Sequence, residues 1–155
     1  MLDCKAAAPL VSEQLFFYIS TEITLTPDFN TARHIAEAHC AAWTNRDPNA
    51  VSLRYAEQTT MGMNGGEPLV GRAEIAAMAA GFMADFPDLV LTLDSILVAD
   101  HHMVYAWTFD GHHKETKRHV RFSGWEEWDL DDNLKVTKSL GWYDAADYER
   151  QVAGD

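Results

Sequence analysis

Four segments rich in apolar residues follow one another after Pro87, and each is long enough to form a β-strand. They cover residues 88–99, 103–113, 118–130 and 134–145, and polar turns at 100–102, 114–117 and 131–133 separate them. Connections this short join antiparallel neighbours, because parallel neighbours need a crossover of a dozen or more residues. We therefore expect the second half of the chain to form a meander of long antiparallel strands.

Helical patterns dominate the region before Pro87. Helical spacing relates five residues that would form the buried face of a first helix: Ile35, Ala38, His39, Ala42 and Trp43. This helix would end by Asp47, and a short second helix would run from Pro48 to about Tyr55, since proline is favourable in the first turn.

A third helix is predicted over residues 71–86, after a loop or hairpin marked by Gly65, Gly66 and Pro68. Its apolar face comprises Ile75, Met78, Ala79, Phe82, Met83 and Phe86. Helices followed by a strand meander indicate an α+β fold, in which N-terminal helices pack on a strongly curved antiparallel sheet. A sheet that curls around helices encloses a pocket.

The length of 155 residues, with 47% hydrophobic residues, suits a single domain that buries its own core. Residues 1–29 are predicted to be an N-terminal extension, and residues 30–155 to be the domain. The helical period begins only at about Asn30, which sets this boundary.

The charge balance bears on the partners of the chain. It has 24 acidic and 12 basic residues, a net charge of −12, which argues against nucleic acid and anionic membrane surfaces. A domain of this size does not need a disulfide between Cys4 and Cys40, and the apolar run from Leu15 is too short for a secretion signal. We therefore expect a cytoplasmic protein.

Several phrases of the sequence occur together, in order, in one known family. They are GRAEIAAMAAGFMADFPDL, VYAWTFDGHH, VRFSGWEEW and SLGWYDAADYERQ. The chain resembles the SnoaL-like polyketide cyclase branch of the NTF2-like superfamily over about residues 31–152. The resemblance implies a cone-shaped α+β fold, an apolar cavity and a homodimer formed through the sheet. Because the superfamily includes cyclases, epoxide hydrolases, isomerases, dehydratases and non-catalytic members, the fold alone leaves the function open.

Comparison with the cyclase and epoxide-hydrolase patterns also predicts which residues face the cavity. On the three last strands these are Ala106, Thr108 and Asp110, then Phe122, Gly124, Glu126 and Trp128, then Ser139, Gly141 and Tyr143. The opposite face would carry an apolar patch suited to a homodimer interface, made of Tyr105, Trp107, Phe109, Trp125 and Trp142.

The departures from these patterns restrict the chemistry. Gly141 stands where the cyclases and epoxide hydrolases have a catalytic aspartate, and Thr108 stands where the epoxide hydrolases have an arginine. Met61 and Met63 replace the tyrosine and asparagine that hold the water in the epoxide hydrolases. The resemblance therefore excludes epoxide hydrolysis here and leaves the usual cyclase mechanism without its acid.

The remaining candidate catalytic residues are Asp110 and Glu126, with His112 beside them. A carboxylate in an apolar cavity has a raised pKa and can act as a general acid or base in enolisation, dehydration or ring closure, without a cofactor. The alternative is that Asp110 or Glu126 pairs with Arg54, Arg72 or a backbone donor and only closes the cavity.

The predicted ligand is a small, mostly apolar molecule that carries a carbonyl or hydroxyl group. Its expected contacts are Tyr55, Thr108, Phe122, Trp128, Ser139 and Tyr143. No metal is expected, because the histidines at 101, 102, 112, 113 and 119 lack a recognised ligand spacing. Two hypotheses follow: a cofactor-independent cyclase, isomerase or dehydratase, or a non-catalytic binding or dimerisation module that has lost the family's aspartate.

Overall fold

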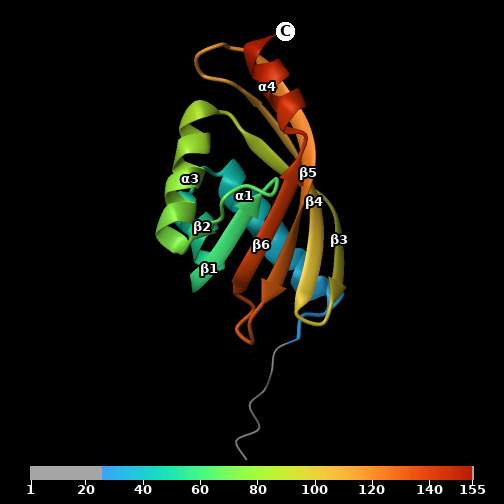
Figure 1. Cartoon of the computed structure of the whole chain (residues 1–155). Helices are drawn as coiled ribbons and strands as arrows, with labels where there is room; N and C mark the ends of the chain where they lie inside the picture. The colour runs from blue at the N-terminus through green and yellow to red at the C-terminus, as the bar shows by residue number, and fades with distance from the viewer. Residues whose placement is uncertain (1–25, 155) are drawn as a thin grey trace, which may run out of the picture.

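The computed structural model describes residues 26–154, which form four helices and one six-stranded sheet (Figure 1). In chain order the elements are α1 Phe29–Thr44, α2 Pro48–Leu53, β1 Tyr55–Met63, β2 Leu69–Val70, α3 Arg72–Asp85, β3 Val90–Ala99, β4 His102–His112, β5 His119–Leu130, β6 Val136–Tyr143 and α4 Ala145–Ala153. The α+β class and the helices at 29–44, 48–53 and 72–85 confirm the prediction. Most of the predicted N-terminal extension lies outside the described residues.

The strand order in the sheet is β2-β1-β6-β5-β4-β3. Strands β3 to β6 form the predicted antiparallel meander, but β1 pairs with β6 in parallel, so the sheet is mixed rather than wholly antiparallel. Parallel pairing is allowed here because the whole of α3, β3, β4 and β5 lies between the two strands in sequence. Strand β1 and helix α4 were not predicted.

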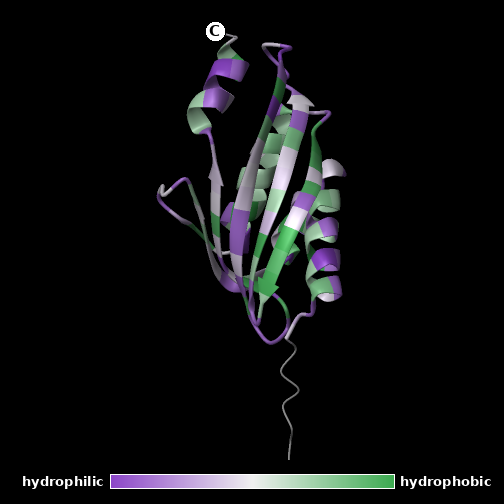
Figure 2. Cartoon of the chain, turned by 90° about the vertical axis from the view of Figure 1, so that its right-hand side faces the viewer, coloured by the Kyte–Doolittle hydropathy of each residue, from purple (hydrophilic) through white to green (hydrophobic). Residues whose placement is uncertain are grey.

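The helices cover one side of the curved sheet (Figure 1). Helix α1 packs against β3, α3 against β1 and β2, and α4 against β5. Aspartates begin the first two helices: Asp28 accepts a hydrogen bond from the Thr31 amide at 2.7 Å, and Asp47 accepts one from Ala50 at 2.9 Å. Figure 2 shows hydrophilic and hydrophobic residues alternating along the strands, as expected of a sheet with one buried face.

The residues predicted to face inward on β5 and β6 do so in the structure. For β4 the predicted inward and outward faces are exchanged, because the prediction was shifted by one residue. Tyr105, Trp107 and Phe109 are buried, and they pair directly with Glu126, Gly124 and Phe122 on β5. Directly paired residues of an antiparallel sheet lie on the same face, so these aromatic residues point inward.

Ala106, Thr108 and Asp110 consequently lie on the outer face, not toward the cavity as expected. A shift of one residue moves every side chain of a strand to the other face. Of the five residues predicted for an outer apolar patch, Tyr105, Trp107 and Phe109 are therefore inside, and Trp125 and Trp142 remain outside, 45% and 37% exposed.

Candidate functional site

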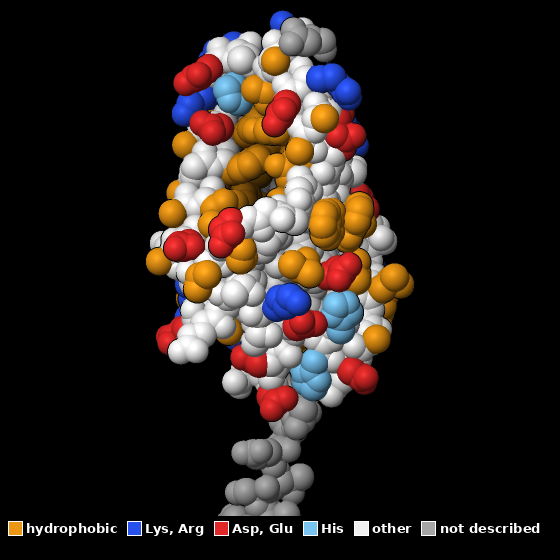
Figure 3. All heavy atoms as spheres, in the orientation of Figure 1, with side chains coloured by type: hydrophobic (Ala, Val, Ile, Leu, Met, Phe, Trp, Pro, Cys, Tyr) orange, Lys and Arg blue, Asp and Glu red, His pale blue; other side chains and the backbone are white. Residues whose placement is uncertain are grey.

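A cavity of about 330 Å³ lies between helix α3 and the concave face of the sheet. Figure 3 shows it as a hollow of hydrophobic side chains that opens below α4, with acidic side chains around its rim. Six aromatic residues, five aliphatic or sulfur-containing residues and two glutamates line it: Trp43, Met61, Met63, Glu67, Leu69, Met78, Phe82, Leu91, Trp107, Phe109, Phe122, Glu126 and Tyr143. Its size is at the lower end of the range for small-molecule sites.

Glu126 lines this cavity from the middle of β5 and is only 6% exposed. Its Oε2 atom accepts hydrogen bonds from Trp128 Nε1 at 2.9 Å and from Ser139 Oγ at 3.0 Å. The Tyr105 side chain approaches the same carboxyl group. The hydrogen bonds from Trp128 and Ser139 both go to Oε2.

Burial raises the pKa of Glu126 above its ordinary value, and this outweighs the hydrogen bonds from Trp128, Ser139 and Tyr105, which lower it. Among the described residues, no lysine, arginine or histidine contributes to this pKa. A carboxyl group without a cationic partner in an apolar site retains its proton to a higher pH, and it can then donate a hydrogen bond or a proton.

The groups behind Glu126 stay neutral over the ordinary pH range. Burial lowers the pKa of His39 to about 3 and raises that of Cys40 to about 12. Burial also raises the pKa of Tyr55 and Tyr105 well above 10. Glu126 is the remaining acidic group of this cluster, and its pKa is raised from the ordinary value of 4.5.

Gly141 lies directly opposite Glu126 on β6. A Cβ atom at this position would be 2.5 Å from Met63 Sδ and 3.2 Å from Glu126 Cγ. The Met63 side chain thus fills the space that a larger residue at 141 would need. The glycine therefore leaves no empty space beside Glu126, because methionine fills it.

Asp110 and His112 are far from this arrangement because they lie on the outer face of β4. Asp110 binds Arg121 Nη1 at 2.8 Å and His119 Nε2 at 3.0 Å, and these hydrogen bonds lower its pKa. His112 Nδ1 lies 2.8 Å from Asp88 Oδ2. The structure therefore does not bring Asp110 together with Glu126. Asp110 therefore matches the alternative in which a carboxylate forms a structural ion pair. Its partner is Arg121, not Arg54 or Arg72 as expected.

Two of the six predicted ligand contacts, Phe122 and Tyr143, line the cavity. Tyr55, Trp128 and Ser139 are fully buried behind its wall, where Trp128 and Ser139 hold the Glu126 carboxyl group. They support the site without lining it.

Thr108 is on the outer face, and its hydroxyl group bonds to Asp94 at 2.7 Å and to Ser123 at 2.8 Å. The expectation that it contacts the ligand depended on the wrong facing of β4.

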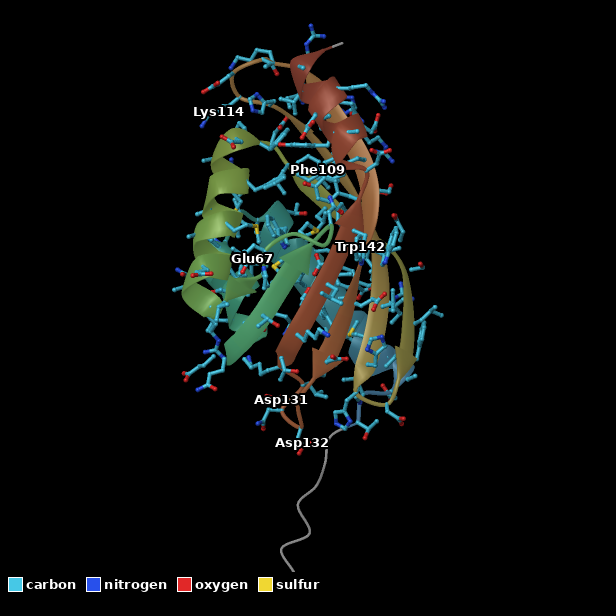
Figure 4. The ribbon with its side chains drawn as sticks, viewed as in Figure 1. Glu67, Phe109, Lys114, Asp131, Asp132 and Trp142 are labelled. Carbon is cyan, nitrogen blue, oxygen red and sulfur yellow. The ribbon has the colours of Figure 1, made fainter. Side chains whose placement is uncertain are left out.

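Sequence reasoning missed Glu67, Trp43 and Trp107 as cavity residues. Glu67 belongs to the loop between β1 and β2, where glycines and proline indicated only a turn (Figure 4). Trp107 was assigned to the outer face, although the alternation of large aromatic and smaller residues along β4 could have placed it correctly. Its indole nitrogen is buried and has no hydrogen-bond partner among the described residues.

Within residues 26–154, no group of three histidine, cysteine, aspartate or glutamate side chains is arranged to hold a metal ion. No helix in this part of the chain has the length and apolar character needed to cross a membrane.

The arrangement of a curved sheet, covering helices and an apolar cavity with an internal carboxyl group defines the class of ketosteroid isomerase-like, NTF2-like folds. The chain belongs to the SnoaL-like family, since the model of the SnoaL-like domain matches residues 36–138. No curated protein matches the chain in sequence.

Solved structures with the same fold share little sequence with the chain. A ketosteroid isomerase-like protein from Catenulispora acidiphila, in complex with trimethylamine, is 22% identical with a TM-score of 0.70, covering 77% of this chain and 92% of that one. An epoxide hydrolase of limonene-epoxide-hydrolase type from M. tuberculosis is 16% identical with a TM-score of 0.67, covering 83% and 93%.

A third structure is SalBIII, an epoxide hydrolase/cyclase-like enzyme of pyran-ring formation in the polyether salinomycin. It is 12% identical with a TM-score of 0.69, and the match covers 77% of this chain and 95% of that one.

Proposed function

We propose that the protein binds a small, mostly apolar molecule with a carbonyl or hydroxyl group and acts on it as a cofactor-independent isomerase, cyclase or dehydratase. The observation that carries this proposal is the buried carboxyl group of Glu126, which has no cationic partner among the described residues, in the wall of an apolar cavity. The reaction class agrees with that of the epoxide hydrolase/cyclase-like relative.

Glu126 is the general acid or base of the proposed reaction. Its raised pKa leaves it protonated at a pH where an exposed glutamate is ionised, and in this form it can protonate a ligand oxygen. At a pH above its pKa the ionised carboxylate can instead receive a proton from a carbon next to a carbonyl group. Trp128 and Ser139 hold Oε2 in place. Asp110 has no part in this mechanism because it lies on the outer face.

The aromatic side chains of the lining would contact the apolar body of the ligand. Trp107 contributes its ring to this wall, while its indole nitrogen is buried and has almost no accessible surface.

A non-catalytic binding protein is the second candidate, and the pair Gly141 and Met63 favours it. The position of the family's aspartate is filled by a side chain without acid–base chemistry. In this alternative Glu126 would only orient a ligand, its removal would change affinity, and neither the wild type nor the variant would convert the ligand.

The experiment is a thermal-shift screen against small aromatic, polyketide-like and steroid-like carbonyl compounds, because a ligand that binds only the folded state raises the melting temperature. Each hit is repeated with Glu126→Gln, and with Glu127→Gln as the matched control on the opposite face of the same strand. Hits weakened only in Glu126→Gln support the site, and conversion of a hit by the wild type but not by Glu126→Gln supports the enzyme. Binding without conversion favours the second candidate, and hits unaffected by Glu126→Gln contradict the site.

A further inference from the structure

The lining of the cavity contains acidic residues but no basic ones. It contains two glutamates, Glu67 and Glu126, and none of its thirteen residues is lysine, arginine or histidine. The surrounding protein has the same sign, with a net charge of −12. The cavity is thus an apolar space in a negative field, which attracts cations and repels anions.

The two glutamates differ in their position. Glu126 is buried in the middle of the sheet, whereas Glu67 is exposed in the loop between β1 and β2 (Figure 4). Glu126 is held by two hydrogen bonds, and Glu67 takes part in none of the ion pairs found within residues 26–154. The cavity therefore has one acidic group inside it and a second one in contact with water.

The apolar part of the lining also suits a cation. Trp43, Trp107, Phe82, Phe109, Phe122 and Tyr143 present aromatic rings to one small space. The faces of aromatic rings attract organic cations, tryptophan most strongly, and the attraction grows when the cation is removed from water. A carboxylate combined with several aromatic rings is the composition that recognises alkylammonium groups.

We propose that the cavity selects ligands that join an apolar body to a protonated amine or quaternary ammonium group, and that it excludes anionic ligands. The ammonium group lies at the exposed side of the cavity, where the Glu67 carboxylate pairs with it and aromatic rings of the lining contact it, and the apolar body extends toward Glu126. This proposal rests on the function proposed above and specifies its ligand class.

The test uses three probes of matched shape: benzyltrimethylammonium, its uncharged carbon isostere neopentylbenzene, and the anion 3-phenylpropanoate. Binding is measured by titration of tryptophan fluorescence, because Trp43 and Trp107 line the cavity. Wild type is compared with Glu67→Gln, and with Glu115→Gln, which removes the same charge from an exposed turn outside the cavity. Ionic strength is held constant because long-range attraction depends on it.

The expected result is that the ammonium probe binds at least about tenfold more tightly than the isostere, and that the anion binds most weakly. Glu67→Gln is expected to reduce the tenfold preference by at least about threefold, and Glu115→Gln to leave it unchanged. Equal or tighter binding of the isostere overturns the proposal, as does an equal loss in both variants, which would indicate general attraction to an acidic surface.

The outcomes separate this proposal from the function on which it rests. If neutral carbonyl compounds bind and depend on Glu126, but charge has no effect on affinity, only the ligand class is wrong. If neither charged nor neutral probes bind, both proposals are wrong.

Discussion

Glu126 and Gly141 face each other across the neighbouring strands β5 and β6, and the side chain of Met63 covers the glycine. Glu126 is thus the one acidic residue in the buried part of the cavity within residues 26–154, and it is directly paired with a glycine. If the resemblance places the cyclases' aspartate at Gly141, as the sequence suggests, the carboxyl group here comes from the neighbouring strand instead.

Gly141→Asp is expected to destabilise the fold, because its Cβ would lie 2.5 Å from Met63 Sδ. Displacement of the methionine into the cavity costs about 1–3 kcal/mol of unfolding free energy, as in other overpacked cores. Combining Gly141→Asp with Met63→Ala should recover part of this loss. Urea unfolding of the two single variants and the double variant measures the coupling, and strictly additive effects would contradict the contact.

Glu126→Gln is expected to change how stability depends on pH. Between the ordinary glutamate pKa of 4.5 and the higher value in the folded protein, the folded state holds more protons than the unfolded state. The free energy of unfolding of the wild type therefore falls as pH rises through this interval, by at most about 1.4 kcal/mol per pH unit.

Glu126→Gln removes this dependence, so its stability relative to the wild type should increase with pH above 4.5. Unfolding midpoints measured between pH 4.5 and pH 8.5 check this expectation, with Glu127→Gln as control. Parallel curves for wild type and Glu126→Gln would show that the pKa of Glu126 is not raised.

His39 should produce a dependence of the opposite sign. Its pKa is lowered by burial from 6.5 to about 3, and Arg54 contributes to the same direction. The unfolded state therefore binds the extra proton between these values, and the folded state loses about 2 kcal/mol of stability between pH 7 and pH 5.

The cause of this loss is visible in the structure, because His39 Nε2 accepts a hydrogen bond from Trp43 Nε1 at 3.1 Å, which a protonated ring cannot do. His39→Gln keeps an acceptor but does not titrate, so it should be less sensitive to acid. Chemical unfolding at pH 7 and pH 5 compares the two proteins. An unchanged difference between the two pH values would mean that His39 is already protonated or exposed.

We expect the chain to form a homodimer through the outer face of the sheet. Trp125 and Trp142 are directly paired there and are 45% and 37% exposed, and Figure 4 shows Trp142 on the side of the sheet away from α3. Exposed paired tryptophans favour an interface, because their burial removes a large apolar area from water. Sedimentation velocity should show that Trp125→Lys dissociates the dimer. A wild type that is monomeric at all concentrations would contradict the prediction.

The sequence was sufficient for the fold class, for the three N-terminal helices and for the facing of Glu126, because helical and alternating patterns directly reflect burial. It failed at β4, where comparison with related families was preferred to the plain alternation of Tyr105, Trp107 and Phe109. Since facing has a period of two, an alignment error of one residue moved Asp110 into the predicted site and Trp107 out of it.

Other parts of the site could not be predicted because they depend on contacts between distant segments. Glu67 reaches the cavity only through the path of a loop, and Met63 meets Gly141 only because β1 pairs in parallel with β6. No local pattern in the sequence specifies either contact. Strand β1 could not be assigned to its partner from a turn motif, because a tight turn joins only strands that are neighbours in sequence, and β1 pairs with β6.

The pairing of β1 with β6 also affects the order in which the molecule can fold. Met61 pairs with Ser139 and Met63 with Gly141, so residues almost eighty positions apart must meet before the sheet is complete. Such non-local pairing slows folding, because the entropy of closing a long loop is lost before the contacts form. During synthesis β1 leaves the ribosome well before its partner strand β6. The Glu126 carboxyl group cannot accept its hydrogen bond from the Ser139 hydroxyl until β6 has been made. The cavity is thus among the last features of the fold to form, and any ligand that binds it recognises only the completed chain.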